Sequence, residues 1–140
     1  MPHIVRTASS TDLDYLLAHD RHVTAAALRR CVEEGRVLLL EERGEISGWL
    51  RWSLFWDEIP FLNMIFLSES CRGAGLGTQL LDVWEADMLK LGHARVLTST
   101  VSNERSQNLY RRRGYADSGV LLLPGEIAEL LLVKELSAVS

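Results

Sequence analysis

The chain has 140 residues and a mass of 15.8 kDa, the size of one ordinary domain. Hydrophobic residues make up 47% of it and charged residues 24%, which excludes a disordered, collagen-like or disulfide-scaffold chain. The formal net charge of -4 argues against non-specific electrostatic binding to nucleic acid or to an anionic membrane. We therefore expect one domain over residues 1–140, with no nucleic-acid partner and no membrane partner.

Few features point to another compartment or to a metal. The two cysteines, Cys31 and Cys71, are too few for a disulfide framework and form no paired zinc motif. No apolar run approaches the ~18 residues of a membrane span, and the start has no charged segment followed by an apolar stretch. His19 and His22 lie one helical turn apart without an evident third ligand. We expect a cytoplasmic protein without a metal.

The first half of the chain reads as a strand, two helices and three strands. The opening strand covers 3–7. Thr11 is predicted to cap the first helix, with Asp14 three residues further on, and a second helix covers about 21–34 and ends at Gly35. Strands at 37–42 and 46–55 form a hairpin, and a third strand covers 59–67 after a loop at 56–58.

The second half alternates in the same way. A glycine-rich turn at 72–77 leads into a helix that extends to about Leu91. A strand at 94–100, a short basic helix at 104–113 and final strands at 115–123 and 127–134 follow. This order predicts an α/β fold, a mixed sheet with helices on both faces. The apolar face of the long helix is predicted to hold Leu76, Leu80, Trp84, Met88 and Leu91.

The glycine-rich turn indicates a phosphate site. Glycines allow the backbone to approach a ligand, and the start of a helix offers free N–H groups and a positive dipole end. Arg72 adds a charge at the edge of the turn. The alternative is a tight turn that needs glycine only for its positive φ. A P-loop would need a Lys after the glycines, and a dinucleotide fingerprint would need a third glycine where Thr78 stands, so both nucleotide readings are weak.

Two motifs resemble those of the GNAT superfamily of acetyl-CoA-dependent N-acetyltransferases. The first is Arg72-x-x-Gly75-x-Gly77 at the glycine turn. The second is Asn103-x-x-Ser106-x-x-Leu109-Tyr110-x-x-x-Gly114-Tyr115. The resemblance implies a central, mostly antiparallel mixed sheet of about seven strands flanked by about four helices.

The resemblance also implies an acetyl-CoA site. The pantetheine arm would lie along Ile65, Phe66 and Leu67, in a gap where a bulged strand splays from its neighbour. Asn103 and Ser106 would contact the cofactor, although Asn103 also stands where a helix N-cap belongs. The arginines at 111–113 would complement the helix dipole or meet a phosphate of the cofactor. The pyrophosphate would sit on the backbone of Arg72, Gly73, Ala74, Gly75, Leu76, Gly77 and Thr78.

The implied reaction is a direct attack of a primary amine on the thioester. Tyr110 matches the acid of the family, since a phenol with a pKa near 10 keeps its proton at neutral pH; the alternative is an aromatic side chain packed in the core. The backbone N–H of Leu67 is our candidate oxyanion donor. Some members of the family use a Glu as base, and Phe61 stands at the matching position here. Glu58 or Asp57 could serve as the base instead; the alternative is that both are solvated loop carboxylates.

The acceptor is a small-molecule or peptide amine that the sequence does not name. Trp49, Trp52 and Trp56, with Asp57 and Asn63, are the candidates for contacting it, although core packing is the commoner role of such tryptophans. Because the matching base is absent, a non-catalytic acyl-CoA-binding or sensor domain is the alternative function. A homodimer through the apolar segments 120–123 and 130–133 is also open.

Overall fold

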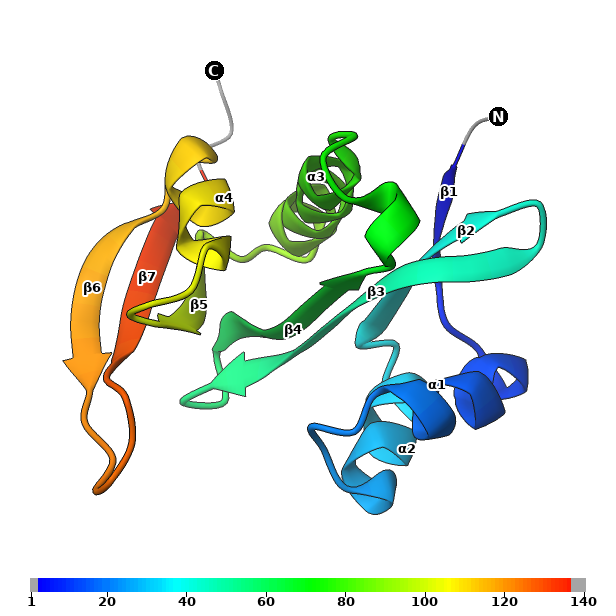
Figure 1. Ribbon diagram of the computed structural model, residues 1–140, viewed down its shortest axis with the longest axis horizontal. Helices are drawn as coiled ribbons and strands as arrows, with labels where there is room; N and C mark the ends of the chain where they lie inside the picture. The colour runs from blue at the N-terminus through cyan, green and yellow to red at the C-terminus, as the bar shows by residue number, and fades with distance from the viewer. Residues whose placement is uncertain (1–2, 137–140) are drawn as a thin grey trace.

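Seven strands form one twisted sheet in the order β1-β2-β3-β4-β5-β7-β6 in the computed structural model, which describes residues 3–136 (Figure 1). Every neighbouring pair is antiparallel except β4 and β5, which are parallel. The predicted mixed, mostly antiparallel sheet is therefore confirmed. The strands are β1 (Ile4–Thr7), β2 (Val37–Glu42), β3 (Glu45–Phe55), β4 (Ile59–Leu67), β5 (Arg95–Val101), β6 (Ala116–Leu121) and β7 (Glu129–Glu135).

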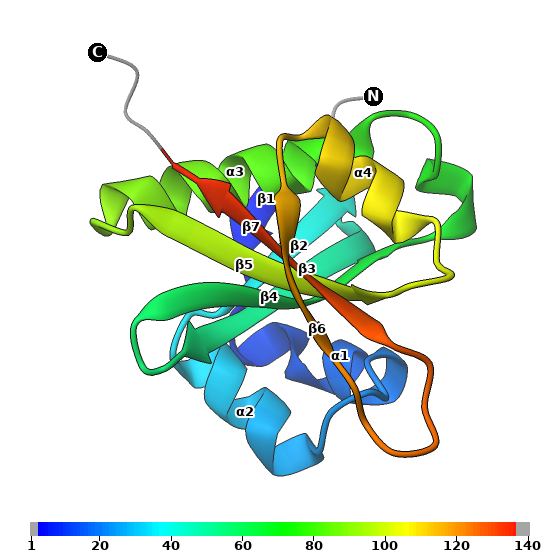
Figure 2. The same ribbon diagram turned by 90° about the vertical axis from the view of Figure 1, so that its left-hand side faces the viewer.

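Helices cover both faces of this sheet, as the alternating order predicts. On one face lie α1 (Leu13–His19) and α2 (Ala25–Glu33), and on the other lie α3 (Leu76–Lys90) and α4 (Ser106–Arg112) (Figures 1 and 2). Each face has its own apolar core. Trp84 and Tyr110 belong to the core under α3 and α4, and Leu16 and Trp49 to the core against α1 and α2.

One irregularity shapes the centre of the sheet. β4 holds one residue more than β3 between the pairs Trp52–Leu62 and Arg51–Met64, so Asn63 is a β-bulge. On its other side β4 pairs with β5 only at Phe61–Leu97 and Leu62–Thr98. Beyond Leu62 the two strands diverge, and the rest of β4 has no partner on that side among the described strands.

Several element boundaries differ from the sequence prediction. Thr11 is not the cap: a 3-10 turn (Ser10–Asp12) precedes α1, its N-cap is Ser9, and the Ser9 N–H donates to Asp12 Oδ2 at 2.8 Å. The second helix begins at Ala25, because the Thr24 side chain accepts from the Ala27 N–H at 3.2 Å and caps it there.

The C-terminal half shows two further differences. Leu91 is 66% exposed, because α3 ends at Lys90 and the last position of the predicted stripe lies beyond the helix. The segment 130–133 is not an edge, since β7 lies between β5 and β6. The edge strand is β6, and the exposed side chains of Val120, Leu121, Leu122 and Leu123 lie in it and just after it.

Within residues 3–136, no helix combines the length and the apolar character that a bilayer crossing needs.

The ion pair at the first turn gives a stability prediction. Asp12 accepts from the Ser9 N–H and from both Nη atoms of Arg6, at 2.8 and 2.9 Å. We expect Asp12→Asn to lower the free energy of unfolding by about 1–2 kcal/mol, measured by urea denaturation at pH 7. Asp14→Asn, an exposed acid in the first turn of α1, is the control and should cost much less.

The same variant has a defined pH dependence. The Arg6 guanidinium lowers the pKa of Asp12 from 3.8 to about 2. A lowered pKa in the folded state means that the carboxylate stabilises the protein fully above its unfolded pKa and ceases to do so as the pH falls through the folded pKa. The gap between wild type and Asp12→Asn should therefore close toward pH 2; a gap that persists there would contradict the pairing.

Candidate active site

A cleft opens where β4 and β5 diverge, and it has two connected parts. An outer cavity of about 780 Å³ extends toward the glycine turn. An inner pocket of about 220 Å³ lies between the two strands, and its walls include Leu62, Met64, Ser99 and Thr100. Ile65, Glu104 and Ser106 line both parts, so the two form one continuous space.

The glycine turn at the outer end has the geometry of an anion site. Gly73 and Gly75 have φ of 80° and 78°, a left-handed conformation that favours glycine, and Gly75 is the N-cap of α3. The first amides of α3 therefore point out of the helix without intrahelical partners. Gly77 is held tightly, since a Cβ there would meet Leu109 at 3.2 Å and Leu67 at 3.4 Å. We call the segment 72–78 the phosphate turn, after its predicted ligand. A further cavity of about 250 Å³ is lined by five of its residues: Gly73, Gly75, Leu76, Gly77 and Thr78.

Positive charge gathers at the same end. Arg72 and Arg105 line the outer cavity, and Arg112 lines the cavity at the phosphate turn. Arg112 is one of three consecutive arginines at 111–113. The other two form ion pairs outside the cleft, Arg111 with Asp117 at 2.8 Å and Arg113 with Asp82. Only one arginine of the run, Arg112, therefore faces the cleft.

The exposed edge of β4 supplies backbone groups to the cleft. The Leu67 carbonyl accepts from Arg72 Nε at 3.2 Å, so it points away from β3. Polar groups of alternate residues point to the same side of a strand, which places those of Ile65 with those of Leu67. Since the pairing with β5 ends at Leu62, the amides of Ile65 and Leu67 face the cleft, and the intervening Phe66 stacks on Trp49 at 4.5 Å.

Tyr110 of α4 closes the inner pocket from the core side. Its side chain is 3% exposed, and burial raises its pKa to about 12, with the Glu104 charge adding to the shift and the Thr98 side chain opposing it. Nearby, Ser106 Oγ and Thr100 Oγ1 share a hydrogen bond of 2.8 Å that joins α4 to β5. A phenol in this position retains its proton throughout the neutral range.

The opposite side of the inner pocket holds polar groups that the sequence prediction partly missed. Asn63, at the bulge, donates through Nδ2 to Ser53 Oγ at 2.8 Å. Two carboxylates, Glu104 and Glu129, also line the pocket. The only sequence signal for Glu129 is an acid at the head of a strand whose next four residues are apolar, which by itself names no site.

The structure separates other predicted residues from this pocket. Leu67, the predicted oxyanion donor, lines the outer cavity and the cavity at the phosphate turn, whereas Tyr110, the predicted acid, lines the inner pocket. Glu58 and Asp57 are exposed in the β3–β4 turn, and neither lines the cleft. The chain rises about 3.3 Å per residue in a strand, which sets Glu58 well away from the bulge.

The three tryptophans do not form one pocket. Trp49 belongs to the core under α1 and α2, Trp52 to the core under α3, and Trp56 is 76% exposed at the β3–β4 turn. Asn103 is exposed and lines none of the cavities named above. It does not cap α4 either, because the helix begins at Ser106 with Arg105 as its N-cap.

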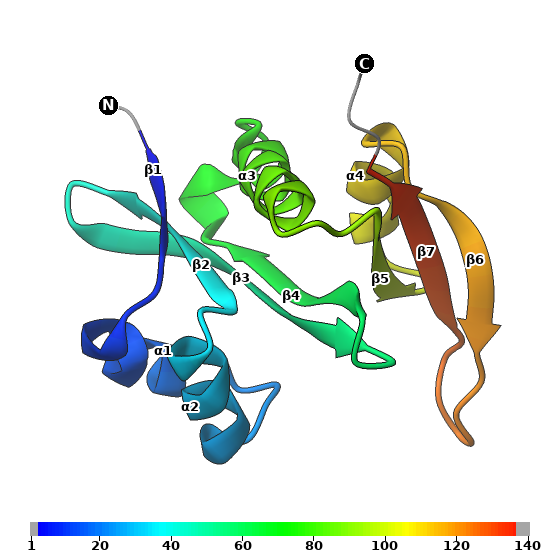
Figure 3. The same cartoon turned by 180° about the vertical axis from the view of Figure 1, so that it is seen from behind.

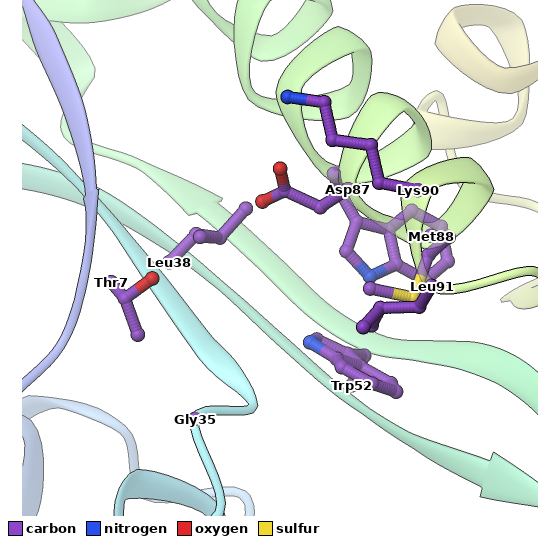
Figure 4. Close-up of a pocket in the computed structure, with 9 residues that line it drawn as sticks. Thr7, Gly35, Leu38, Trp52, Asp87, Met88, Lys90 and Leu91 are labelled. Atoms are coloured by element: carbon purple, nitrogen blue, oxygen red, sulfur yellow. The ribbon is translucent and has the colours of Figure 1, made fainter.

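A separate cavity of about 280 Å³ lies at the far end of α3, between Trp52, Met88 and Leu91 (Figure 4). Its charged groups are Asp87 and Lys90, one residue of each sign, and it contains no residue of either motif. The cleft between β4 and β5 is therefore the candidate active site.

Comparison with known proteins agrees with this geometry. Residues 6–115 match the family described as the acetyltransferase (GNAT) family. The chain belongs to the GNAT acetyltransferase family. Members of this family use acetyl-CoA as the acetyl donor.

Individual relatives show how far the likeness extends. A protein from Methanocaldococcus jannaschii, named an uncharacterised N-acetyltransferase, is 32% identical over 102 residues, which are 68% of this chain and 64% of that relative. The match thus covers less than two thirds of the relative's length. A GNAT-family acetyltransferase from Bacillus cereus has a TM-score of 0.77 at 26% identity, covering 96% of this chain and 98% of the other.

A more distant structure shares the fold alone. N-acetylglutamate synthase from Neisseria gonorrhoeae, solved with coenzyme A and N-acetyl-glutamate, has a TM-score of 0.83 at 17% identity. The likeness covers 99% of this chain and 36% of that one.

The phosphate turn gives a testable prediction. Gly75→Ala places a side chain at a left-handed φ and costs about 1–2 kcal/mol of stability or shifts the turn. We expect the affinity for coenzyme A, measured by titration calorimetry, to fall at least about tenfold as the amides of the turn move. Gly92→Ala is the matched control, since Gly92 has φ 95° and free space around it but lies after α3. An equal loss of affinity in both variants would mean that the effect is global.

Proposed function

We propose that this protein transfers an acetyl group from acetyl-CoA to a primary amine of a small molecule or peptide. The observation that carries the proposal is the single cleft between β4 and β5, which joins an anion-binding turn to a pocket closed by a buried phenol. The membership of the GNAT acetyltransferase family supports acetyl transfer in general. The amine acceptor is our inference from the family and from the pocket.

The residues present fit coenzyme A. The amides of the phosphate turn, with Arg72, Arg105 and Arg112 around them, suit a diphosphate and its neighbouring phosphate. The unpaired edge of β4 offers backbone groups to the amides of a pantetheine arm, as an added strand would receive them. A cytoplasmic location, where coenzyme A is available, completes the proposal.

When bound, acetyl-CoA supplies a thioester whose carbonyl carbon is open to attack by a neutral amine. The Ile65 amide, which borders both parts of the cleft, would donate to the carbonyl oxygen as negative charge develops there. We assign this role to Ile65 in place of Leu67, because Ile65 shares the inner pocket with Tyr110. Leu67 and Phe66 then line the pantetheine and phosphate portions.

Tyr110 would act as the acid. The raised pKa keeps the proton on Oη at neutral pH, from where it would pass to the departing sulfur as the carbon–sulfur bond breaks. The phenolate left behind would take up the proton that the attacking nitrogen loses, which restores the phenol. The hydrogen bond between Ser106 and Thr100 joins α4 to β5, and it would thereby position the Tyr110 phenol in the pocket. The competing function is a non-catalytic acyl-CoA-binding or sensor domain, which would use the phosphate turn but not the Tyr110 proton.

Ligand-induced stabilisation tests the cofactor. A ligand at about 100 times its Kd adds about 2.7 kcal/mol to the free energy of unfolding. We expect acetyl-CoA and coenzyme A to raise the melting temperature, and ATP and NAD to leave it unchanged at the same concentrations. Stabilisation by ATP or NAD alone would show that the turn binds another nucleotide, and the acetyltransferase proposal would fail.

Tyr110→Phe tests catalysis against mere binding. We expect kcat for thiol release in the presence of amine to fall about a hundredfold or more, with unchanged affinity for coenzyme A. Tyr115→Phe is the matched control, since its buried phenol donates to Glu85 at 2.9 Å and its ring centre lies 5.5 Å from that of Tyr110. The control should lose about 1–3 kcal/mol of stability but keep its kcat. Equal kcat in wild type and Tyr110→Phe would remove Tyr110 from the acid role.

The pH profile provides a second readout of Tyr110. Because burial raises the pKa of its phenol to about 12, the acid stays protonated well above the ordinary value for tyrosine. The kcat of the wild type should therefore show no alkaline decline until the pH approaches 12. A decline centred at about pH 10, the pKa of a solvated tyrosine, would contradict a buried acid.

A further inference from the structure

Two carboxylates line the inner pocket: Glu129 lines this pocket alone, and Glu104 stands where the pocket adjoins the outer cavity. Glu129, the first residue of β7, stands opposite Val101 of β5 in the strand register. Glu104, between β5 and α4, accepts from Ser106 Oγ at 3.2 Å. The described residues that line this pocket include both carboxylates and no Lys, Arg or His. A substrate in this pocket therefore meets two negative charges and no positive one.

The cation on the neighbouring strand β3, Arg51, lies opposite Met64 in the strand register and already has a partner. Arg51 of β3 donates from Nε and Nη2 to the two carboxylate oxygens of Asp20, at 2.7 and 3.3 Å. The side chains of Arg51 and Asp20 are only 7% and 0% exposed, so releasing Arg51 would leave a buried charge without its partner. Arg105 and Arg72 line the outer cavity but not the inner pocket. Among the described residues, no arginine therefore lines the inner pocket itself.

Glu129 lies on the accessible face of the sheet. Thr98 and Thr100 of β5 are buried toward α3 and α4, so the alternating Ser99 and Val101 face the other side, and the register puts Glu129 on that side with Val101. On this face α1 and α2 lie beneath β2 and β3, and no helix lies beneath β5, β7 and β6 (Figures 1 and 3). An acceptor can thus approach from the side opposite α3 and α4, past Glu129.

We propose that this pocket selects a primary ammonium group whose adjoining carbon carries no carboxylate. An amine next to a neutral carbonyl, as in an amino-acid amide or a peptide N-terminus, or next to an alkyl group, meets this condition, and a free amino acid does not. The inference rests on the proposed acetyl transfer and adds the class of its acceptor. An ammonium group is attracted by Glu129 and Glu104, whereas a carboxylate beside it would be desolvated next to like charges without a counter-ion.

The same charges affect how the amine loses its proton. An opposite charge nearby favours the charged form, so the pKa of the bound amine rises and turnover requires a higher pH. The titratable groups that face Glu129 across the pocket are Glu104 and Tyr110, and the residues that face it from β4, β5 and β6 are uncharged. Removing the charge of Glu129 should weaken acceptor binding and also move the rise of kcat to lower pH.

Matched acceptor pairs test the proposal. The probes are L-phenylalaninamide with L-phenylalanine and L-alaninamide with L-alanine, assayed by thiol release from acetyl-CoA with the wild type, Glu129→Gln and Glu126→Gln. For the wild type we expect kcat/KM to be at least about tenfold higher for the amide than for the free acid of the same amino acid, in every pair of which at least one member is acetylated. Glu129→Gln should raise the KM of the amide about tenfold, reduce the preference and move the rise of kcat to lower pH. Glu126→Gln, on the exposed loop before β7, should resemble the wild type.

Binding of coenzyme A, measured separately by calorimetry, distinguishes the possible failures. Equal use of the free acids and the amides by the wild type, or an unchanged preference in Glu129→Gln, would overturn the acceptor class. Coenzyme A binding without acetylation of either amide would also overturn it, while the cofactor assignment would stand. Loss of coenzyme A binding in the wild type would overturn the proposed function itself.

Discussion

β4 carries one residue more than its partner β3 between Leu62 and Met64, and the bulge at Asn63 bends the strand away from β5. A backbone edge inside a sheet normally forms hydrogen bonds along its whole length, because an unpaired polar group costs free energy when it is buried. Here the edge from Met64 to Leu67 is left without a strand partner on one side. The gap that results is the cleft, and a ligand with its own amides can occupy the place of the absent strand.

The elements on either side of this gap then place the chemistry. β4 ends close to the phosphate turn, so α3 begins with its free amides at the outer end of the cleft. β5 leads into α4, which brings Tyr110 to the inner end. Charge is distributed along the cleft in the same way: Arg72, Arg105 and Arg112 line the outer parts, Glu104 lines both the outer cavity and the inner pocket, and Glu129 lines the inner pocket. Under the proposed function, this distribution would attract a polyanionic donor to the outer parts and a cationic acceptor to the inner pocket.

The sequence predicts the parts of this arrangement that depend on local patterns. The strand, glycine turn and helix at 59–91 and the two motifs are local, and the structure places the strand, the turn and the helix within two residues of the prediction. The predicted cap Thr11 is wrong because the capping box is formed by Ser9 and Asp12, and the ion pair of Asp12 with Arg6 of β1, a contact outside the helical pattern, accompanies it. Glu129 is missed because no local pattern places it. Only the strand order, with β7 between β5 and β6, brings the head of the last strand to the pocket.

Burial explains why the two faces of the pocket differ in character. Tyr110 lies in the core formed with α3, and desolvation by this core is the main cause of its raised pKa. A change in its surroundings would therefore disturb packing as well as chemistry, and the core side of the pocket is fixed by stability. Glu129 is half-buried on β7, beneath which no helix lies on that face, and Asn63 is exposed at the bulge, so substitutions at these two positions remove little packing. Under the proposed function, acceptor preference would therefore be able to change at these positions without disturbing Tyr110 or the phosphate turn.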